Sequence, residues 1–227
     1  MADKSHLSLM RACFQDRFLF LLVSLLCLIL LTPLLESFVR LKILIDIFVT
    51  IVFISGIYTV SNKKSIAVVS SILAIPMLIS LWGPVFTKTD FFILIGDISG
   101  IVFMILMVFS ILSYIFNEQE ASANVIYASI VVYLLLALMW SFIYSVVEIL
   151  NPGSFSIPEQ TIEEGRSVFA YYSMVTITTL GYGDITPVTN QARAFSMLEA
   201  VVGQIYLVVL VARLVGINIA QTMNKKE

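Results

Sequence analysis

The sequence is poor in the residues on which enzymes and soluble domains depend. Only 12% of its 227 residues are charged and 59% are hydrophobic, whereas a soluble domain carries about 25% charged residues. The single histidine, His6, argues against a histidine-based metal centre or catalytic triad. The net charge of −2 gives no reason to expect a nucleic-acid partner. These absences predict a membrane protein that is not an enzyme and uses no organic cofactor.

Hydrophobic runs, by contrast, are abundant. A membrane-spanning helix needs about 20 mostly apolar residues. Six segments meet this requirement: Phe18 to Leu35, Ile43 to Val60, Ile66 to Trp82, Phe91 to Phe116, Val125 to Leu150 and Ala194 to Ala220. We predict an all-α membrane protein with six transmembrane helices. The polar stretch Asn117 to Asn124 indicates two modules, residues 1–121 and residues 122–227.

The basic residues of the loops favour one orientation. With the N-terminus inside, eight lysines and arginines face the cytoplasm and five face outward, as the positive-inside rule requires. An even number of spans then places both termini in the cytoplasm. The absence of Asn-X-Ser/Thr sites agrees with a bacterial source. We therefore expect the plasma membrane, as the inner membrane of a bacterium.

The last loop contains the most informative run, Thr176 to Asp184, which reads TITTLGYGD. Glycine adopts backbone conformations that other residues avoid, and rings of carbonyl oxygens can replace the water shell of a potassium ion. The apolar piece before it, Val168 to Thr178, is too short to cross a bilayer and indicates a re-entrant helix. Non-helical backbone at membrane depth is tolerated only inside protein or beside water. The run is therefore predicted to line a pore.

This run resembles the signature sequence of potassium channels, and the resemblance covers roughly the last hundred residues. It implies a selectivity filter in which backbone carbonyls, with the hydroxyl of the first residue, bind transported K⁺. These ion-binding residues are Thr179, Leu180, Gly181, Tyr182 and Gly183. Because one loop supplies one wall of a pore, the resemblance implies a homotetramer in membrane lipid. A gating ligand or partner is left open.

The resemblance also implies residues that support the filter. These are Thr176, Thr178, Asp184, Tyr171 and Tyr172. In the family, the ring of Tyr182 points away from the axis and packs against the pore helix. We hypothesise that the Tyr171 hydroxyl hydrogen-bonds Asp184; the alternative is an aromatic of the membrane interface. Leu180 stands where valine is usual, and Val175 where some relatives carry a buried glutamate.

The last apolar segment is expected to line the inner pore. Gly203 lies where the family often has a hinge glycine; close helix packing is the alternative, and Gly216 could bend the helix instead. A stripe at every fourth residue after Gly203 is wholly apolar. It consists of Leu207, Val211, Val215 and Ile219. A hydrophobic constriction at Val215 or Ile219 would gate by dewetting.

The first four segments follow the layout of voltage-gated channels without their sensor chemistry. Voltage sensors carry repeated arginines in the fourth span, and Phe91 to Phe116 has no arginine or lysine. We expect little or no voltage dependence. Asp46 and Asp97 lie near the outer ends of their segments, where we interpret them as hydrated from outside or paired with a lysine, Lys42 or Lys88. Glu199 is expected to pack behind the filter.

The function predicted from the sequence is passive, potassium-selective conduction. Two alternatives remain. A membrane sensor or accessory subunit would share the architecture without conducting. A potassium transporter subunit carries four pore-loop repeats in one chain, and the single signature here argues against it.

Overall fold

The computed structural model describes residues 17–32, 42–60, 64–82, 90–158 and 166–224. His6 lies outside these residues. Each of the six predicted segments coincides with a helix within the described residues. The helices are Arg17–Thr32, α2 (Lys42–Val60), α3 (Lys64–Trp82), α4 (Asp90–Asn117), α5 (Ala123–Leu150), α6 (Arg166–Ile177) and α7 (Asn190–Asn224).

Three helices of the described residues are long and apolar enough to cross a membrane. They are Phe91–Asn117, Ala123–Leu150 and Asn190–Met223. The all-α membrane architecture is thus confirmed, while the count of six spans stays a prediction. The apolar parts Arg17–Thr32 and Val68–Ser80 are shorter.

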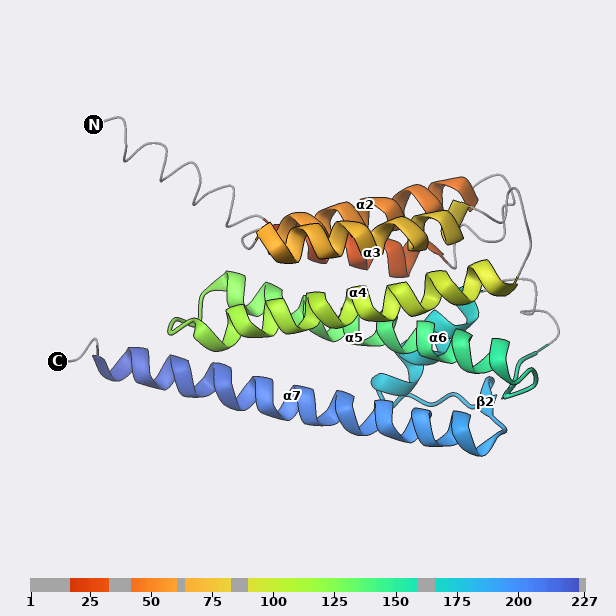
Figure 1. The fold of residues 1–227 in the computed structure, drawn as a ribbon. Coiled ribbons are helices and arrows are strands. Elements are labelled where there is room, and N and C mark those ends of the chain that lie inside the picture. Colours follow the sequence, from red (N-terminus) through yellow and green to blue (C-terminus); the bar gives the residue numbers. More distant parts are fainter. Residues whose placement is uncertain (1–16, 33–41, 61–63, 83–89, 159–165, 225–227) are drawn as a thin grey trace.

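The hairpin of α4 and α5 forms the middle of the molecule (Figure 1). The polar turn between them ends at Ser122, whose side chain accepts a hydrogen bond from the Val125 N–H and so caps α5. At the other end of α5, the Asn151 N–H bonds the Val147 carbonyl and closes the helix. Such a short connection requires the two helices to pack as antiparallel neighbours.

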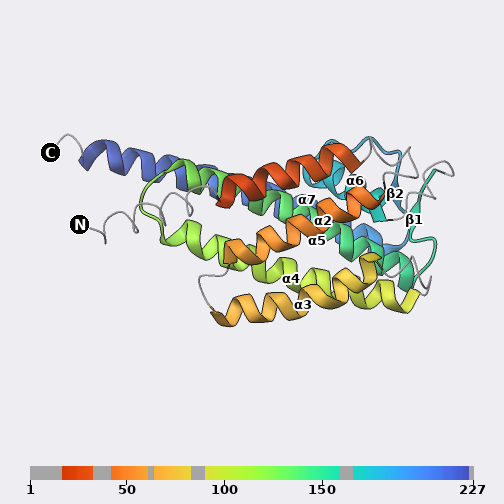
Figure 2. The same ribbon diagram turned by 90° about the horizontal axis from the view of Figure 1, so that it is seen from above.

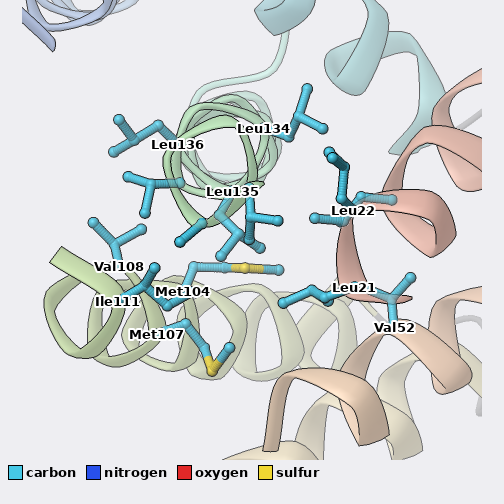
Figure 3. Packing of buried hydrophobic residues seen from close by; sticks show 14 of the residues in the cluster. Leu21, Leu22, Val52, Met104, Met107, Val108, Ile111, Leu134, Leu135 and Leu136 are labelled. Carbon is cyan, nitrogen blue, oxygen red and sulfur yellow. The ribbon is translucent and has the colours of Figure 1, made fainter. Parts of the chain in front are cut away.

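A single hydrophobic core joins the N-terminal helices to α5. Met104 of α4 is buried between Leu135 of α5 and Leu21 of the first helix, as Figure 3 shows, and Met107 is buried beside Gly56 of α2. Viewed from above, the helix Arg17–Thr32 (red) and α3 (gold) lie on opposite sides of this bundle (Figure 2). The boundary predicted near residue 121 falls in a turn, and apolar packing continues across it.

Asp97 corrects one expectation. Asp97 lies on the face of α4 that packs against α5, where it is 0% exposed. It is therefore not hydrated from outside. There its carboxylate accepts a hydrogen bond of 2.6 Å from the Ser145 hydroxyl. The side chains of Asp46, Lys42 and Lys88 lie outside the described part, so the suggested pairing with a lysine stays a prediction.

Helix α7 runs along one side of the molecule for nearly its whole length (Figure 1). Only 6% of its most apolar stretch is buried within the chain. At its start, a two-residue antiparallel pairing joins β1 (Phe155–Ser156) to β2 (Thr186–Pro187). This pairing ties the loop after α5 to the loop before α7, and the run Thr176 to Asp184 begins in the last turn of α6 and continues into the second of these loops.

Candidate functional site

Helix α6 has the properties of the predicted re-entrant segment. Its 12 residues span about 18 Å at 1.5 Å per residue, too little for a hydrocarbon core of about 30 Å. The helix was expected over Val168 to Thr178 and stops at Ile177. It lies beside α5, in the half of the molecule where α7 begins (Figure 1).

A cluster of aromatic side chains holds α6 against α5. Phe155 of β1 is at its centre, with ring centroids 5.4 Å from Tyr144, 5.3 Å from Phe169 and 5.3 Å from Tyr172. All four residues are buried. Aromatic pairs in this edge-on geometry contribute about 0.5–1.5 kcal/mol each beyond their buried area. The cluster therefore fixes the orientation of α6 and of the run that follows it.

The backbone after α6 alternates in the sign of φ. Thr179, Gly181 and Gly183 have φ of 59°, 56° and 79°, while Leu180 and Tyr182 between them do not have positive φ. Threonine rarely adopts this left-handed conformation. Alternation of this kind turns successive peptide groups to the same side of the chain. All five residues are exposed.

The hydrogen bonds of this run show which side its carbonyls face. The N–H groups of Leu180 and Gly181 both point at the Val175 carbonyl of α6, at 3.0 and 3.3 Å. Their peptide bonds are trans, and in a trans peptide the carbonyl points opposite to the N–H. The carbonyls of Thr179 and Leu180 therefore point away from α6, into open space.

The predicted hydrogen bond between Tyr171 and Asp184 is present. The Tyr171 hydroxyl donates to Asp184 Oδ2 at 2.6 Å, and the Ile185 N–H donates to Oδ1 at 3.1 Å. The hydroxyl of Tyr171, which donates to the carboxylate, lowers the pKa of Asp184 below its ordinary value. The bond ties the end of the run to α6.

The other predicted support residues lie near α6 with differing contacts. The Thr178 hydroxyl donates to the Met174 carbonyl at 2.6 Å, which extends the end of the helix. The hydroxyls of Tyr172 and Ser196 are 2.7 Å apart and join α6 to α7. The hydroxyl of Tyr172 also interacts with Thr176.

Two side chains of the run point away from their own chain. Tyr182 is 67% exposed and Leu180 is 55% exposed. Most of the Tyr182 side chain is thus uncovered within one chain, and its expected packing against the pore helix stays a prediction. The same exposure means that Leu180 does not alter packing behind the run within one chain.

Glu199 of α7 was expected behind the filter, and the structure places it against α5 and α6. It is 0% exposed. Its carboxyl group hydrogen-bonds the hydroxyls of Tyr144 on α5 and Ser173 on α6. The sequence indicated the acid in an apolar helix but did not indicate its two partners, which lie 55 and 26 residues away along the chain.

Gly203 is a point of close helix packing. A Cβ atom added there would lie 2.6 Å from Ile177 Cγ1 and 3.0 Å from the Ile177 carbonyl oxygen. Helix α7 continues without interruption from Asn190 to Asn224. The structure thus favours the packing alternative over a bend at Gly203. Gly216 has nothing within 4 Å of such an atom.

The predicted apolar stripe faces away from the rest of the chain over most of its length. Val211, Val215 and Ile219 are 57%, 51% and 56% exposed, while Leu207 is partly buried. An exposed apolar stripe on a helix is available to line a cavity or to contact another copy. Its gating role stays a prediction.

Arg213 makes a contact that the sequence did not indicate. Its guanidinium group donates to the carbonyls of Ile115, Phe116 and Glu118 at 2.7 to 3.3 Å. The last carbonyls of a helix have no partner within it and carry partial negative charge. Arg213 therefore joins the end of α4 to the last third of α7. From the sequence, Arg213 was only one of the basic residues that favour a cytoplasmic C-terminus.

Glu148, near the end of α5, was also missed. Its carboxylate accepts the backbone N–H groups of Gly153 and Phe155 at 2.7 and 3.1 Å. Gly153 has φ of 83°, so Glu148 stabilises a turn that delivers Phe155 to the aromatic cluster. Among the described residues, no group of three or more His, Cys, Asp or Glu could hold a metal ion.

Comparison with known proteins gives one match. The model of a family described as "Ion channel" matches residues 101–219, more than half of the chain. The matched part begins within α4 and includes α5, α6, the run with alternating φ and most of α7. No curated protein and no solved structure matches.

Proposed function

The chain belongs to the ion channel family, and on this premise we propose that it conducts potassium selectively through a pore shared by four copies. Ion channels pass ions passively, down the electrochemical gradient. The proposed filter consists of Thr179, Leu180, Gly181, Tyr182 and Gly183.

The observation that carries the proposal is the direction of the filter carbonyls. The two N–H groups aimed at Val175 leave the Thr179 and Leu180 carbonyls on the open side of the chain, and the alternating φ supports the same direction for the carbonyls that follow. A potassium ion that enters a pore must exchange its water shell for such oxygens. One row supplies part of a coordination shell, and four rows around an axis complete each ring.

The exposed surfaces of the single chain support assembly. The proposed filter is exposed, and so are Val211, Val215 and Ile219 of α7. Cyclic symmetry would bring these surfaces to a common axis, where the carbonyls face one another. In that arrangement Tyr182, which is 67% exposed in one chain, is covered by the neighbouring copy.

The N-terminal helices support a channel with little voltage sensing. Helix α4 contains no lysine or arginine over Asp90–Asn117, so it carries no positive charge to move in the membrane field. Its buried acid, Asp97, is hydrogen-bonded to α5. A steep conductance–voltage relation in symmetric potassium would contradict this part of the proposal.

Ion flux into liposomes tests the proposal. Purified protein is reconstituted, and uptake of Rb⁺, as a tracer for K⁺, is compared with uptake of Na⁺, with Ba²⁺ as blocker. We expect Ba²⁺-sensitive Rb⁺ uptake that clearly exceeds Na⁺ uptake. Equal uptake of the two ions would contradict selectivity, and no uptake would favour a non-conducting accessory subunit.

A pair of glycine variants tests whether selective Rb⁺ uptake depends on the proposed filter. Gly181 and Gly153 both have positive φ and nothing within 4 Å of an added Cβ atom. Alanine costs about 1–2 kcal/mol at such a φ and meets no collision at either position. We expect Gly181→Ala to abolish selective Rb⁺ uptake and Gly153→Ala, the matched control, to retain most of it, because strain in the turn before β1 reaches the filter only indirectly, through Phe155 and α6. Equal loss in both variants would argue against the assignment of the filter.

A further inference from the structure

We propose that Glu199 is a positioning residue for the filter, acting as an uncharged carboxylic acid that joins α6 to α5 and α7. The inference rests on the proposed function for its effect on conduction. The protonation and the hydrogen bonds of Glu199 can be tested whether or not the protein conducts ions. Its hydrogen-bond partners, Tyr144 and Ser173, lie on α5 and α6 outside the filter, so its effect on conduction acts through α6.

Counting hydrogen atoms gives the protonation state. Ser173 Oγ is 2.6 Å from the Ala137 carbonyl oxygen, and it also hydrogen-bonds one oxygen of Glu199, while the Tyr144 hydroxyl bonds the other. These three hydrogen bonds need three hydrogens. A serine and a tyrosine hydroxyl supply one each, and a carbonyl supplies none. The third hydrogen must be on the Glu199 carboxyl group, which then donates to Ser173 Oγ.

The burial of Glu199 also favours the protonated, uncharged carboxyl group. Glu199 is 0% exposed, and an ionised carboxylate without a compensating charge is costly in such a place. The titratable groups that face it are Tyr133 and Tyr144 on α5 and Tyr172 on α6. Among the described residues, no lysine or arginine contributes to its electrostatics.

The bond of Glu199 is one of two consecutive contacts between α6 and α7. Ser173 lies opposite Glu199, and four residues later Ile177 lies against Gly203, itself four residues after Glu199. Residues four apart lie on the same face of a helix. The two helices therefore run side by side over one turn, with a polar contact followed by a tight apolar one.

This turn of α6 leads directly into the proposed filter. Val175, whose carbonyl accepts the N–H groups of Leu180 and Gly181, lies between Ser173 and Ile177 on α6. A shift of α6 at Ser173 would move that carbonyl, and with it the peptide groups whose oxygens face the pore. Glu199 thus sets the position of the filter from behind.

Three variants separate hydrogen bonding from mere burial. In Glu199→Gln, the amide can donate to Ser173 and accept from Tyr144, so all three hydrogen bonds persist. Glu199→Leu has similar volume and makes neither bond. Asp97→Asn is the matched control, because Asp97 is also a buried acid bonded to a serine but lies between α4 and α5.

The readouts are ion selectivity and infrared spectroscopy. We expect the ratio of Rb⁺ to Na⁺ uptake to fall about tenfold in Glu199→Leu, from the loss of buried hydrogen bonds, and to stay near wild type in Glu199→Gln and Asp97→Asn. A selectivity loss as large in Glu199→Gln as in Glu199→Leu would overturn the proposal. Unchanged selectivity in Glu199→Leu would overturn it too.

Infrared difference spectra of wild type and Glu199→Gln at neutral pH test the proton directly. We expect a protonated-carboxyl band in the wild type that the variant lacks. Its absence would show an ionised Glu199 and overturn the proposal, whether or not Glu199→Leu folds. A wild-type protein that shows the band but passes no ions would instead count against the proposed function.

Discussion

Tyr171 is the residue that joins the end of the proposed filter to α6. Its hydroxyl reaches Asp184 across 13 residues of chain. The residues between them include every position with positive φ in the run, at Thr179, Gly181 and Gly183. Residues in such conformations persist when the surrounding structure holds them. One side-chain bond at the end of the run limits how far its backbone can relax.

Replacing Tyr171 with phenylalanine removes this bond and keeps the ring. We expect the filter to loosen, so that inactivation during long pulses becomes several-fold faster; a net hydrogen bond of about 1 kcal/mol corresponds to such a factor. Currents recorded in planar bilayers measure the rate. Phe169→Leu, which disturbs the aromatic cluster without touching Asp184, is a useful comparison. An unchanged inactivation rate in Tyr171→Phe would contradict the role.

Tyr171→Phe should also change how inactivation responds to a fall in external pH. The Tyr171 bond lowers the pKa of Asp184, so the stability it gives is present above the ordinary aspartate pKa and is lost as external pH falls through the lowered value. Without the hydroxyl the pKa rises toward its ordinary value. Falling external pH should therefore accelerate inactivation less in Tyr171→Phe, which lacks the bond at every pH, than in the wild type.

At the scale of elements, the attachment of α7 to the rest of the chain occurs at separate points. Near its start Glu199 and Gly203 contact α6. Midway, the Tyr206 hydroxyl donates to the Ser129 carbonyl of α5 at 2.6 Å. Farther along, Arg213 binds the end of α4. The last contact gives the N-terminal helices a direct connection to the part of α7 where the gate is predicted.

The two glycines of α7 should respond differently to alanine. At Gly203 the new methyl group collides with Ile177, whose carbonyl is also held by the Tyr133 hydroxyl at 3.0 Å. Overpacking costs about 1–3 kcal/mol, so Gly203→Ala should lower the melting temperature in detergent. Gly216→Ala meets open space and gains up to about 1 kcal/mol of helix propensity. Equal melting temperatures for both variants would contradict the packing role.

At the scale of the whole molecule, the N-terminal helices pack against the α5 of their own chain. The short turn before Ser122 places α4 against the α5 of the same chain, and the core of Met104, Met107 and Leu135 fills the contact. In the proposed tetramer the N-terminal helices of each copy would thus pack on their own pore module, and the filter and α7 would lie on the exposed side of that copy.

The proposed assembly has a measurable mass. We expect native mass spectrometry of the purified protein to show four copies of the 25.3 kDa chain. Val208 and Val211 are 66% and 57% exposed, so a charged residue at either position should weaken assembly. A wild-type mass of one or two chains, in a preparation that still conducts, would contradict the tetramer.

Local features of the sequence determined the elements and the backbone of the candidate filter. Apolar runs gave helices within a few residues of their predicted ends, since helix formation depends on composition over a short window. Glycine at 181 and 183 permits the positive φ that the structure has there. The bond between Tyr171 and Asp184 was predicted from the resemblance to potassium channels, because Tyr171 stands where that family commonly has an aromatic residue beside the signature.

Only the tertiary structure decided which helix faces meet. The burial of Asp97 against Ser145, the bonds of Glu199 to Tyr144 and Ser173, and the contact of Arg213 with a carbonyl 98 residues away all join distant segments. An apolar helix has no polar face that shows its neighbour, so the pattern of its residues leaves its rotation undetermined. Packing sets that rotation, and with it the partner of every polar side chain inside the bundle.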